Sequence, residues 1–277
     1  MRAFVVGASL MALAAVAEPA TAQATLGWDA AVFSSYDSRG TRLTNKPVFQ
    51  PDIYVTIPAG GASVTVGGWA NIDIAKYDGS SDISESGGAS AFNFAEFDPW
   101  AEVSFGAGPA TLTAGATAYI YPNSKNCGCL NSDYNTEEIY GKIALGVPLS
   151  PKLAAWYDID KLKGLYLEGS VCNGIPLCAD TLTLGALGGY SAGQGPKGTE
   201  NANFADDGFT HLDLSAAVGF TAGPLSISPS FHFVVNNDDA TKITKLSSTG
   251  VVLKDTKFWG GVTISWSKVL GAKEEKK

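Results

Sequence analysis

Apolar and polar residues alternate with a period of two along most of the chain after residue 24. In residues 64–74 every even position is apolar or glycine, whereas the odd positions include Thr65, Asn71 and Asp73. Alternation of this kind indicates a β-strand whose two faces meet different surroundings. It recurs in about twelve segments, near residues 27–38, 47–57, 63–76, 93–106, 110–121, 136–147, 151–160, 164–172, 181–190, 209–221, 225–236 and 256–267. The pattern therefore predicts an all-β fold.

The connections between these segments alternate in length. The short ones contain glycine and proline and cover residues 58–61, 106–109, 148–151 and 222–224. Most of the others are long and polar and cover residues 78–91, 123–135, 191–208 and 237–255, although the link at 161–163 is short. Short turns on one rim and long loops on the other are typical of outer-membrane barrels, with the turns in the periplasm. An even number of strands would place both ends of the barrel on that side.

Aromatic residues mark both ends of the apolar strand faces. Near the rim of short turns the outward set is Trp28, Phe105, Phe220 and Trp266, and near the rim of long loops it is Tyr36, Phe49, Tyr190 and Phe258. Two such belts are typical of barrels embedded in lipid, where aromatic rings lie at the membrane interfaces. A soluble sandwich or barrel, whose apolar face would be its core, predicts neither the belts nor long loops confined to one rim. We therefore expect an antiparallel up-and-down transmembrane β-barrel of about 12 strands over residues 23–267.

Composition agrees with a membrane barrel. Only 17% of the 277 residues are charged, against about 25% in soluble domains, and no stretch after residue 20 is apolar for the ~18 residues of a membrane helix. The net charge of −8 argues against a nucleic-acid partner, because nucleic-acid binders carry basic surfaces.

Residues 1–22 have the features of a secretory signal peptide. An apolar run covers residues 3–17, and Ala20 and Ala22 supply small residues before a cleavage site. The alternative is an N-terminal membrane anchor, for which the run is short. Export of a barrel predicts the outer membrane of a Gram-negative bacterium, with the lipid bilayer and lipopolysaccharide around it. Residues 268–277 would form a charged periplasmic tail.

In this register the polar strand faces point into the lumen. The candidate pore-lining residues are Asp29, Asp37, Arg39, Asp52, Trp69, Asp73, Glu96, Asp98, Glu102, Glu138, Lys142, Asp158, Glu168, Asp213 and His232. Acids dominate this set, and an acidic lumen attracts cations and repels anions, unless the acids only pair with one another through shared protons, water or hydroxyls. Inward aromatics such as Trp100 and Trp156 predict a narrow or partly plugged lumen rather than a wide general porin.

A catalytic interpretation centres on Ser230, His232 and Asp213. We expect Asp213 to lie opposite His232, and Ser215 opposite Ser230, on two neighbouring strands. Ser-His-Asp sites are recognised by geometry, so a hydrolase is conceivable, but a hydrogen-bonded polar cluster is the simpler interpretation. We expect no enzyme activity and no cofactor.

All four cysteines follow the signal segment, and export permits disulfides. Cys172 and Cys178 could form a local staple at a short turn. Cys127 and Cys129, in a long loop, could form a strained bridge or bind a metal, although two thiols without a nearby histidine make a weak metal site. The two pairs lie at opposite rims, so we expect no bridge between them.

Two adjoining stretches, residues 34–40 with Tyr36 and Arg39 and the proline-rich residues 46–54, resemble the start of the TorF family of porin-like proteins. Residues 97–102, 157–160 and 164–169 are similar to later strands of that family. The resemblance runs loosely over the whole mature chain and implies an outer-membrane barrel with a porin-like role.

Together, the pattern and the resemblance favour an outer-membrane porin-like channel. It would pass small, cationic or neutral polar solutes by diffusion through a narrow acidic lumen. The alternatives are a non-conducting structural or interaction barrel whose lumen is filled by side chains and, less favoured, a barrel-embedded hydrolase.

Overall fold

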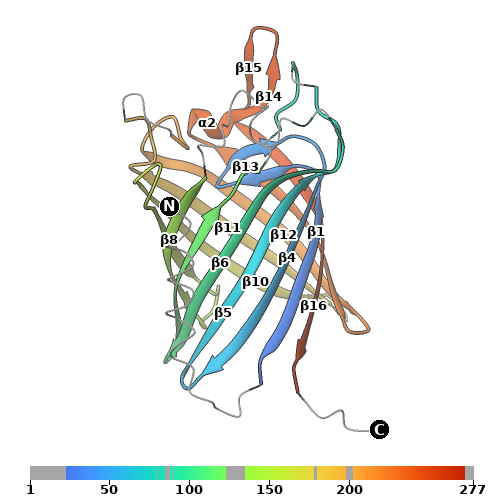
Figure 1. Cartoon of the computed structure of the whole chain (residues 1–277), viewed down its shortest axis with the longest axis vertical. Coiled ribbons are helices and arrows are strands. Elements are labelled where there is room, and N and C mark those ends of the chain that lie inside the picture. The colour runs from blue at the N-terminus through green and yellow to red at the C-terminus, as the bar shows by residue number, and fades with distance from the viewer. Residues whose placement is uncertain are drawn as a thin grey trace.

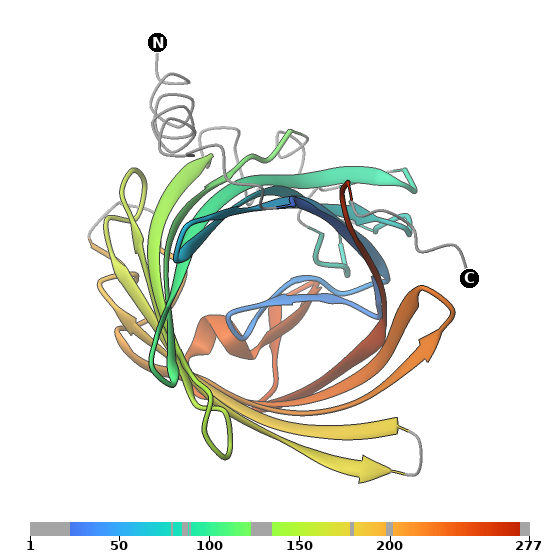
Figure 2. The same ribbon diagram turned by 90° about the horizontal axis from the view of Figure 1, so that it is seen from below.

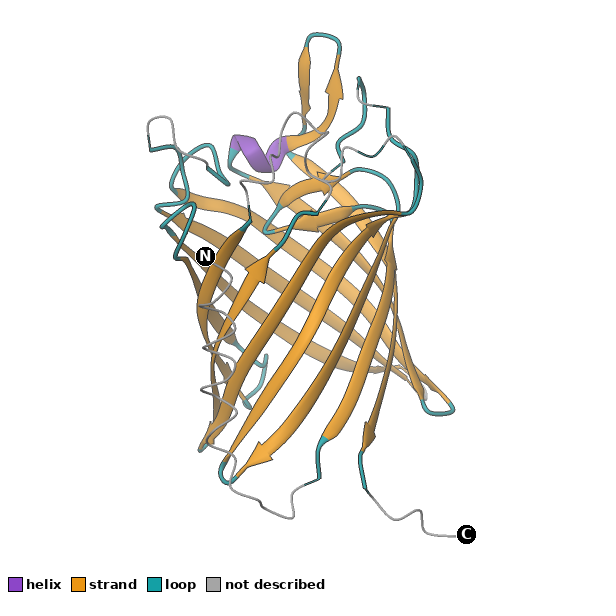
Figure 3. Ribbon diagram, in the orientation of Figure 1, coloured by secondary structure: helices purple, strands orange, loops and turns teal. Residues whose placement is uncertain are grey.

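The computed structural model describes residues 23–78, 80–84, 88, 90–122, 135–177, 180–197 and 202–271. Within them, twelve antiparallel strands close into one barrel (Figures 1 and 3). The strands are β1 (Thr25–Phe33), β4 (Val48–Ala59), β5 (Ala62–Asp73), β6 (Asn93–Ala107), β7 (Ala110–Tyr119), β8 (Thr136–Leu145), β9 (Lys152–Asp158), β10 (Leu165–Leu177), β11 (Asp180–Ala192), β12 (Gly208–Ala222), β13 (Leu225–Asn236) and β16 (Thr256–Val269). Neighbours along the chain pair throughout, and β1 closes the barrel against β16. The predicted up-and-down barrel is confirmed.

The two faces of the wall differ as the alternation predicts. Large apolar side chains point outward and stay exposed, among them Ile53 at 58%, Leu153 at 55% and Phe231 at 51%. A wall with this much apolar surface is stable in hydrocarbon, and its closed hydrogen-bond ladder leaves no strand edge to face lipid. On the inner face, rings lie over glycines: a Cβ on Gly67 would lie 2.6 Å from the Trp100 ring, and one on Gly115 would lie 2.4 Å from the Tyr140 ring. These glycines allow bulky rings to lie flat against the wall.

The two rims differ in the length of their connections. Short turns join β4 to β5, β6 to β7, β8 to β9, β10 to β11 and β12 to β13, and we call this end the turn rim. Thr25 pairs with Val269, so β1 begins and β16 ends at the turn rim. The opposite end, the loop rim, carries the long connections. The strand pair β9–β10 is present despite its short link at the loop rim, with Tyr157 opposite Leu165.

The first predicted strand was too long. β1 ends at Phe33, and the following residues form a separate hairpin of β2 (Tyr36–Ser38) and β3 (Thr41–Thr44). Arg39 and Gly40 make its turn with φ of 50° and 80°, a left-handed conformation that suits glycine. Figure 2 shows this hairpin crossing the interior of the barrel. The placement of Tyr36 in the outer aromatic belt is therefore wrong: its ring lies 5.5 Å from that of Trp69.

The other belt residues follow the prediction more closely. Phe105, Phe220, Tyr190 and Phe258 are exposed, and Trp28 and Trp266 stack across the β1–β16 seam with ring centres 6.5 Å apart.

The loop rim carries further structure between β13 and β16. A single helical turn, α2 (Asp239–Lys242), leads into β14 (Ile243–Ser247) and β15 (Gly250–Leu253), which project beyond the barrel (Figure 1). Among the described residues, no helix is long and apolar enough to cross a membrane. The predicted signal peptide at 1–22, residues 272–277 of the predicted tail, Cys127, Cys129 and Cys178 all lie outside the described residues.

Candidate functional site

The β2–β3 hairpin is fixed to the lumen wall by Arg39. Its Nη1 donates to Glu138 Oε1 on β8 at 2.7 Å, and its Nη2 donates to the Tyr119 hydroxyl on β7 at 3.3 Å. The guanidinium carbon also lies 4.8 Å from the centre of the Tyr166 ring and 5.4 Å from that of Trp156. A paired guanidinium that stacks on aromatic rings is held in one geometry. Arg39 therefore ties the hairpin tip to four neighbouring strands.

A second set of charges fixes the hairpin to the opposite wall. Asp37 lies 3.0 Å from Arg42 on the same hairpin and 3.3 Å from Lys257 on β16. Lys257 also donates to the backbone oxygen of Gly40 and, at 3.0 Å, to that of Thr241. Lys257 is 3% exposed, so these contacts compensate a buried charge.

Lys257 and Arg42 are lumen residues that were not among the predicted pore-lining set. Lys257 has the same strand parity as the inward-facing Trp259, which could have identified it. Arg42 carries no such signal, because it falls in the link between the predicted strands 27–38 and 47–57.

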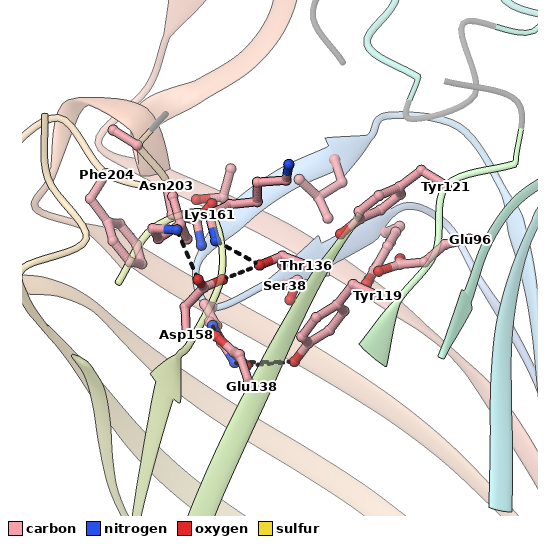
Figure 4. A pocket seen from close by; sticks show the side chains of 16 residues that line it. Ser38, Glu96, Tyr119, Tyr121, Thr136, Glu138, Asp158, Lys161, Asn203 and Phe204 are labelled. Atoms are coloured by element: carbon pink, nitrogen blue, oxygen red, sulfur yellow. Dashed lines mark hydrogen bonds and ion pairs between the residues drawn. The ribbon is translucent and has the colours of Figure 1, made fainter. Parts of the chain in front are cut away.

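Above the hairpin lies a cavity of about 350 Å³, which we call the vestibule (Figure 4). Its floor includes Ser38 and Arg39 of the hairpin together with Glu138. The remaining lining residues are Tyr36, Thr41, Leu43, Glu96, Tyr119, Tyr121, Thr136, Asp158, Lys161, Leu162, Ala202, Asn203 and Phe204. The vestibule thus combines both signs of charge with aromatic walls.

The described residues of the connection between β11 and β12, 193–197 and 202–207, include part of one side of the vestibule, through Ala202, Asn203 and Phe204. Phe204 stacks on Tyr166 with ring centres 5.6 Å apart, and Gln194 Nε2 donates to the backbone oxygen of Gly164 at 3.2 Å. Asp207 holds the start of the loop by accepting from the backbone N–H of Gly193 at 2.7 Å. Burial tends to raise the pKa of Asp207. The hydrogen bonds that it accepts from the Gly193 N–H, from the Ser191 hydroxyl and from further backbone N–H groups outweigh burial and hold this pKa below its usual value.

The half of the lumen near the turn rim is more open. Lys142 points inward from β8, lies 3.1 Å from Glu102, and still has 40% of its side chain exposed. Nearer the middle of the barrel, Asp29 on β1 pairs directly opposite Asp52 on β4, and Asp52 accepts from Trp100 Nε1 at 3.3 Å. Polar side chains here are reached by solvent although they point into the barrel.

The candidate hydrolase residues lie close together in a different register from the expected one. His232 Nδ1 lies 2.9 Å from Asp213 Oδ2, and the imidazole stacks on Trp259 with ring centres 3.7 Å apart. Ser215 is the residue opposite His232, and Ser230 is opposite Ala217. Asp213 lies opposite Val234, so the expected register was wrong by two residues. Among the hydrogen bonds of the described residues, none joins His232 to either serine.

The structure places the other predicted pore-lining residues in two groups. Asp37 and Arg39 belong to the hairpin, whereas the rest lie on barrel strands. Of the latter, Asp158 is fully buried and accepts backbone N–H groups at 2.8–3.2 Å from its own β9–β10 link, so it closes that link. Glu168 accepts from Tyr166 at 3.2 Å. Within the described residues, no group of three histidine, cysteine or acidic side chains could hold a metal ion. Among the described residues, Cys172 has no disulfide partner, and the predicted pairings stay predictions because the other three cysteines are not described.

Residues 17–265 match the profile of a family described as "Bacterial protein of unknown function (Gcw_chp)". No curated protein matches the chain. Solved structures similar to it include LpxR from Salmonella typhimurium, with a TM-score of 0.49, 10% identity, and coverage of 87% of this chain and 99% of that one. OccK8 (OprE) from Pseudomonas aeruginosa has a TM-score of 0.36, 10% identity, and coverage of 90% and 98%. An anion-selective porin from Comamonas acidovorans has a TM-score of 0.36, 8% identity, and coverage of 90% and 99%. None of these matches confirms the resemblance to the TorF family.

Proposed function

The chain belongs to this bacterial family of unknown function (Gcw_chp), and we propose that it is a narrow outer-membrane channel for small cationic or neutral polar solutes. The observation that carries the proposal is the partial exposure of charged side chains inside the barrel. Lys142 is 40% exposed, its partner Glu102 22%, and His232 20%. A barrel filled by its own side chains would bury such groups, and burying charge is costly. Their partial exposure instead favours water around them. The turn half of the lumen therefore supports a continuous water phase.

The hairpin makes the channel narrow. It is held by ion pairs on two opposite parts of the wall, through Arg39 with Glu138 and through Lys257 with Asp37. A solute entering from the loop rim must pass between this hairpin and the wall. Small size is therefore the first requirement for passage.

The charge distribution favours cations. The lumen cations Arg39, Lys142 and Lys257 each have an acidic partner. Asp29 and Asp52 face each other, and among the described residues neither has a cationic partner. Two adjacent carboxylates in a confined lumen create a negative potential that raises the local concentration of cations.

Passive diffusion needs neither a cofactor nor a catalytic group, so we propose no enzyme activity. The exposed apolar wall and the aromatic belts support a position in the Gram-negative outer membrane, with lipid and lipopolysaccharide as neighbours. The charge pattern argues against nucleic acid as a partner. The porin-like role implied by the TorF resemblance is part of the same proposal.

A non-conducting barrel is the second candidate, because the hairpin occupies the loop half of the lumen. Recording ionic current from the refolded full chain in planar lipid bilayers separates the two candidates. We expect small, stable conductance steps. In a KCl gradient, we expect a reversal potential shifted towards the equilibrium potential of K⁺, the mark of a cation-selective pore. Absence of conductance from protein whose circular dichroism shows an intact barrel would contradict the channel and favour the structural role.

A further inference from the structure

We propose that the vestibule binds small zwitterions that carry one ammonium and one carboxylate group, the chemistry of a free amino acid. The inference deepens the proposed function and rests on it, because the vestibule lies on the path from the loop rim to the constriction. Its volume of about 350 Å³ lies within the range of ordinary small-ligand pockets.

Two walls of the vestibule differ in chemistry. Figure 4 shows Glu96, Tyr119 and Tyr121 on one side, and Lys161 and Asn203 on the other. The first wall comes from β6, β7 and the residues just after β7, and the second from the β9–β10 link and the β11–β12 connection. The cavity is therefore acidic and aromatic on one side, and basic and amide-bearing on the other.

The charged groups at the floor are already satisfied. Arg39 and Glu138 form a pair with two hydrogen bonds. Asp158 accepts from Thr136 Oγ1 at 2.6 Å and from the backbone of its own link. By contrast, the one ion pair of the Lys161 ammonium within the described part of the chain is with Asp160, at 4.0 Å and with 41% of that side chain exposed, which is a weak pair. Lys161 is therefore available to an anionic group in the cavity.

A zwitterion fits this separation of charge better than an ion of one sign. Its carboxylate would meet Lys161 and the Asn203 amide, and its ammonium would meet Glu96 beside the Tyr119 and Tyr121 rings, which attract cations. A plain anion would face the acids of the opposite wall, and a plain cation would face Lys161. Like-charge contacts of this kind are a source of specificity.

The test is equilibrium binding of L-alanine to the full chain in detergent, measured by isothermal titration calorimetry. Ethylamine and propionate serve as matched probes that each keep one of the two charged groups. We expect saturable binding of L-alanine and at least about tenfold weaker binding of both probes, the cost of one lost charge-assisted hydrogen bond. Equal binding of all three, or no binding of L-alanine, would overturn the proposal.

Two variants locate the site. Lys161→Gln, in the short β9–β10 link, should weaken L-alanine binding about tenfold, and Glu96→Gln should do the same if the barrel stays folded by circular dichroism. Tyr121→Leu, outside the barrel strands, tests the acidic wall again if Glu96→Gln misfolds. The matched control is Lys152→Gln, a lysine at the turn end of β9, which should leave binding unchanged. Loss of binding in the control, or none in Lys161→Gln, would contradict the assignment.

Conductance recordings of the same preparations distinguish a failure of the proposed channel from a failure of the proposed binding site. L-alanine binding without conductance would refute the channel and leave the site. Conductance without L-alanine binding would refute the site and leave the channel.

Discussion

The two halves of the lumen are built differently although the same strands form their walls. In the loop half, charged side chains are buried and used to hold an inserted hairpin: Glu138 has 2% of its side chain exposed, and Lys257 has 1%. In the turn half, Lys142 and Glu102 also form an ion pair but have 40% and 22% of their side chains exposed. Similar residue types therefore fix a constriction at one end and line a solvated space at the other.

Lumen charge therefore has two separate roles in this barrel. Buried pairs in the loop half stabilise structure and contribute little net field, because each cation lies against an acid. Asp29 and Asp52, half-buried and facing each other near the middle of the barrel, set the potential that a passing ion meets. Size selection and charge selection are thus assigned to different groups of residues.

Removing the hairpin should have the largest effect on the difference in openness between the two halves of the lumen. Replacing residues 36–44 by a short Gly-Ser linker removes β2, β3 and the Arg39 and Asp37 anchors, so the loop half should become as open as the turn half. We expect a several-fold rise in single-channel conductance in planar bilayers. Removing β14 and β15, which project outside the barrel, is the matched control and should leave conductance unchanged. A deletion that conducts like the intact chain would show that the constriction lies elsewhere.

Breaking the hairpin's main anchor should destabilise the loop half. Arg39→Gln leaves the Glu138 carboxylate buried without its cation, a change that costs about 3–5 kcal/mol for buried pairs. The second substitution Glu138→Gln in the same chain should recover much of that loss. Urea unfolding followed by tryptophan fluorescence measures both. If the double variant is no more stable than Arg39→Gln alone, the pair does not act as a unit.

Neutralising the two facing acids should change selectivity and leave pore size alone. Asp29→Asn with Asp52→Asn removes both carboxylates, so the K⁺ over Cl⁻ preference should fall, seen as a smaller reversal potential in a KCl gradient. Asp239→Asn, on α2 outside the barrel wall, is the control. An unchanged reversal potential in the double variant would contradict the assignment of charge selection to these two acids.

Acid should loosen the β11–β12 connection slightly. Because the folded-state pKa of Asp207 lies below its usual value, its contribution is complete above about pH 4 and is lost as the pH falls through the lower folded-state pKa. The effect should stay below about 1 kcal/mol, since Asp207 is exposed. The protection factors of the Gly193 and Gly195 N–H groups against hydrogen exchange should fall below pH 4, and Asp207→Asn should remove this pH dependence. Equal pH dependence in the variant would contradict this.

Much of the wall could be predicted from the sequence, because alternation is a local property. The strand from Leu225 to Asn236 was predicted with the correct ends, and the chain order of the strands follows from the alternating turns and loops. The hairpin could not be predicted in the same way. Residues 34–47 contain few apolar residues and follow no period of two, and what sends them inward is the contact of Arg39 with Glu138, 99 residues away.

The candidate site was predicted only in part for the same reason. Strand parity identified inward residues such as Glu138 and Lys142, but it carries no information about which of them become buried. The vestibule depends on Lys161 and Asn203, which lie in connections between strands and follow no period. Its geometry is set by tertiary contacts such as the stacking of Phe204 on Tyr166.

The most direct test of the division of the lumen is polymer exclusion measured from each side of a planar bilayer. Neutral polyethylene glycols of increasing size, added to one side at a time, lower the single-channel conductance only when they enter the lumen from that side. We predict asymmetry: larger polymers should enter from the turn rim than from the loop rim, and replacing residues 36–44 by a linker should abolish the difference. The same size limit from both sides of the intact chain would contradict the account.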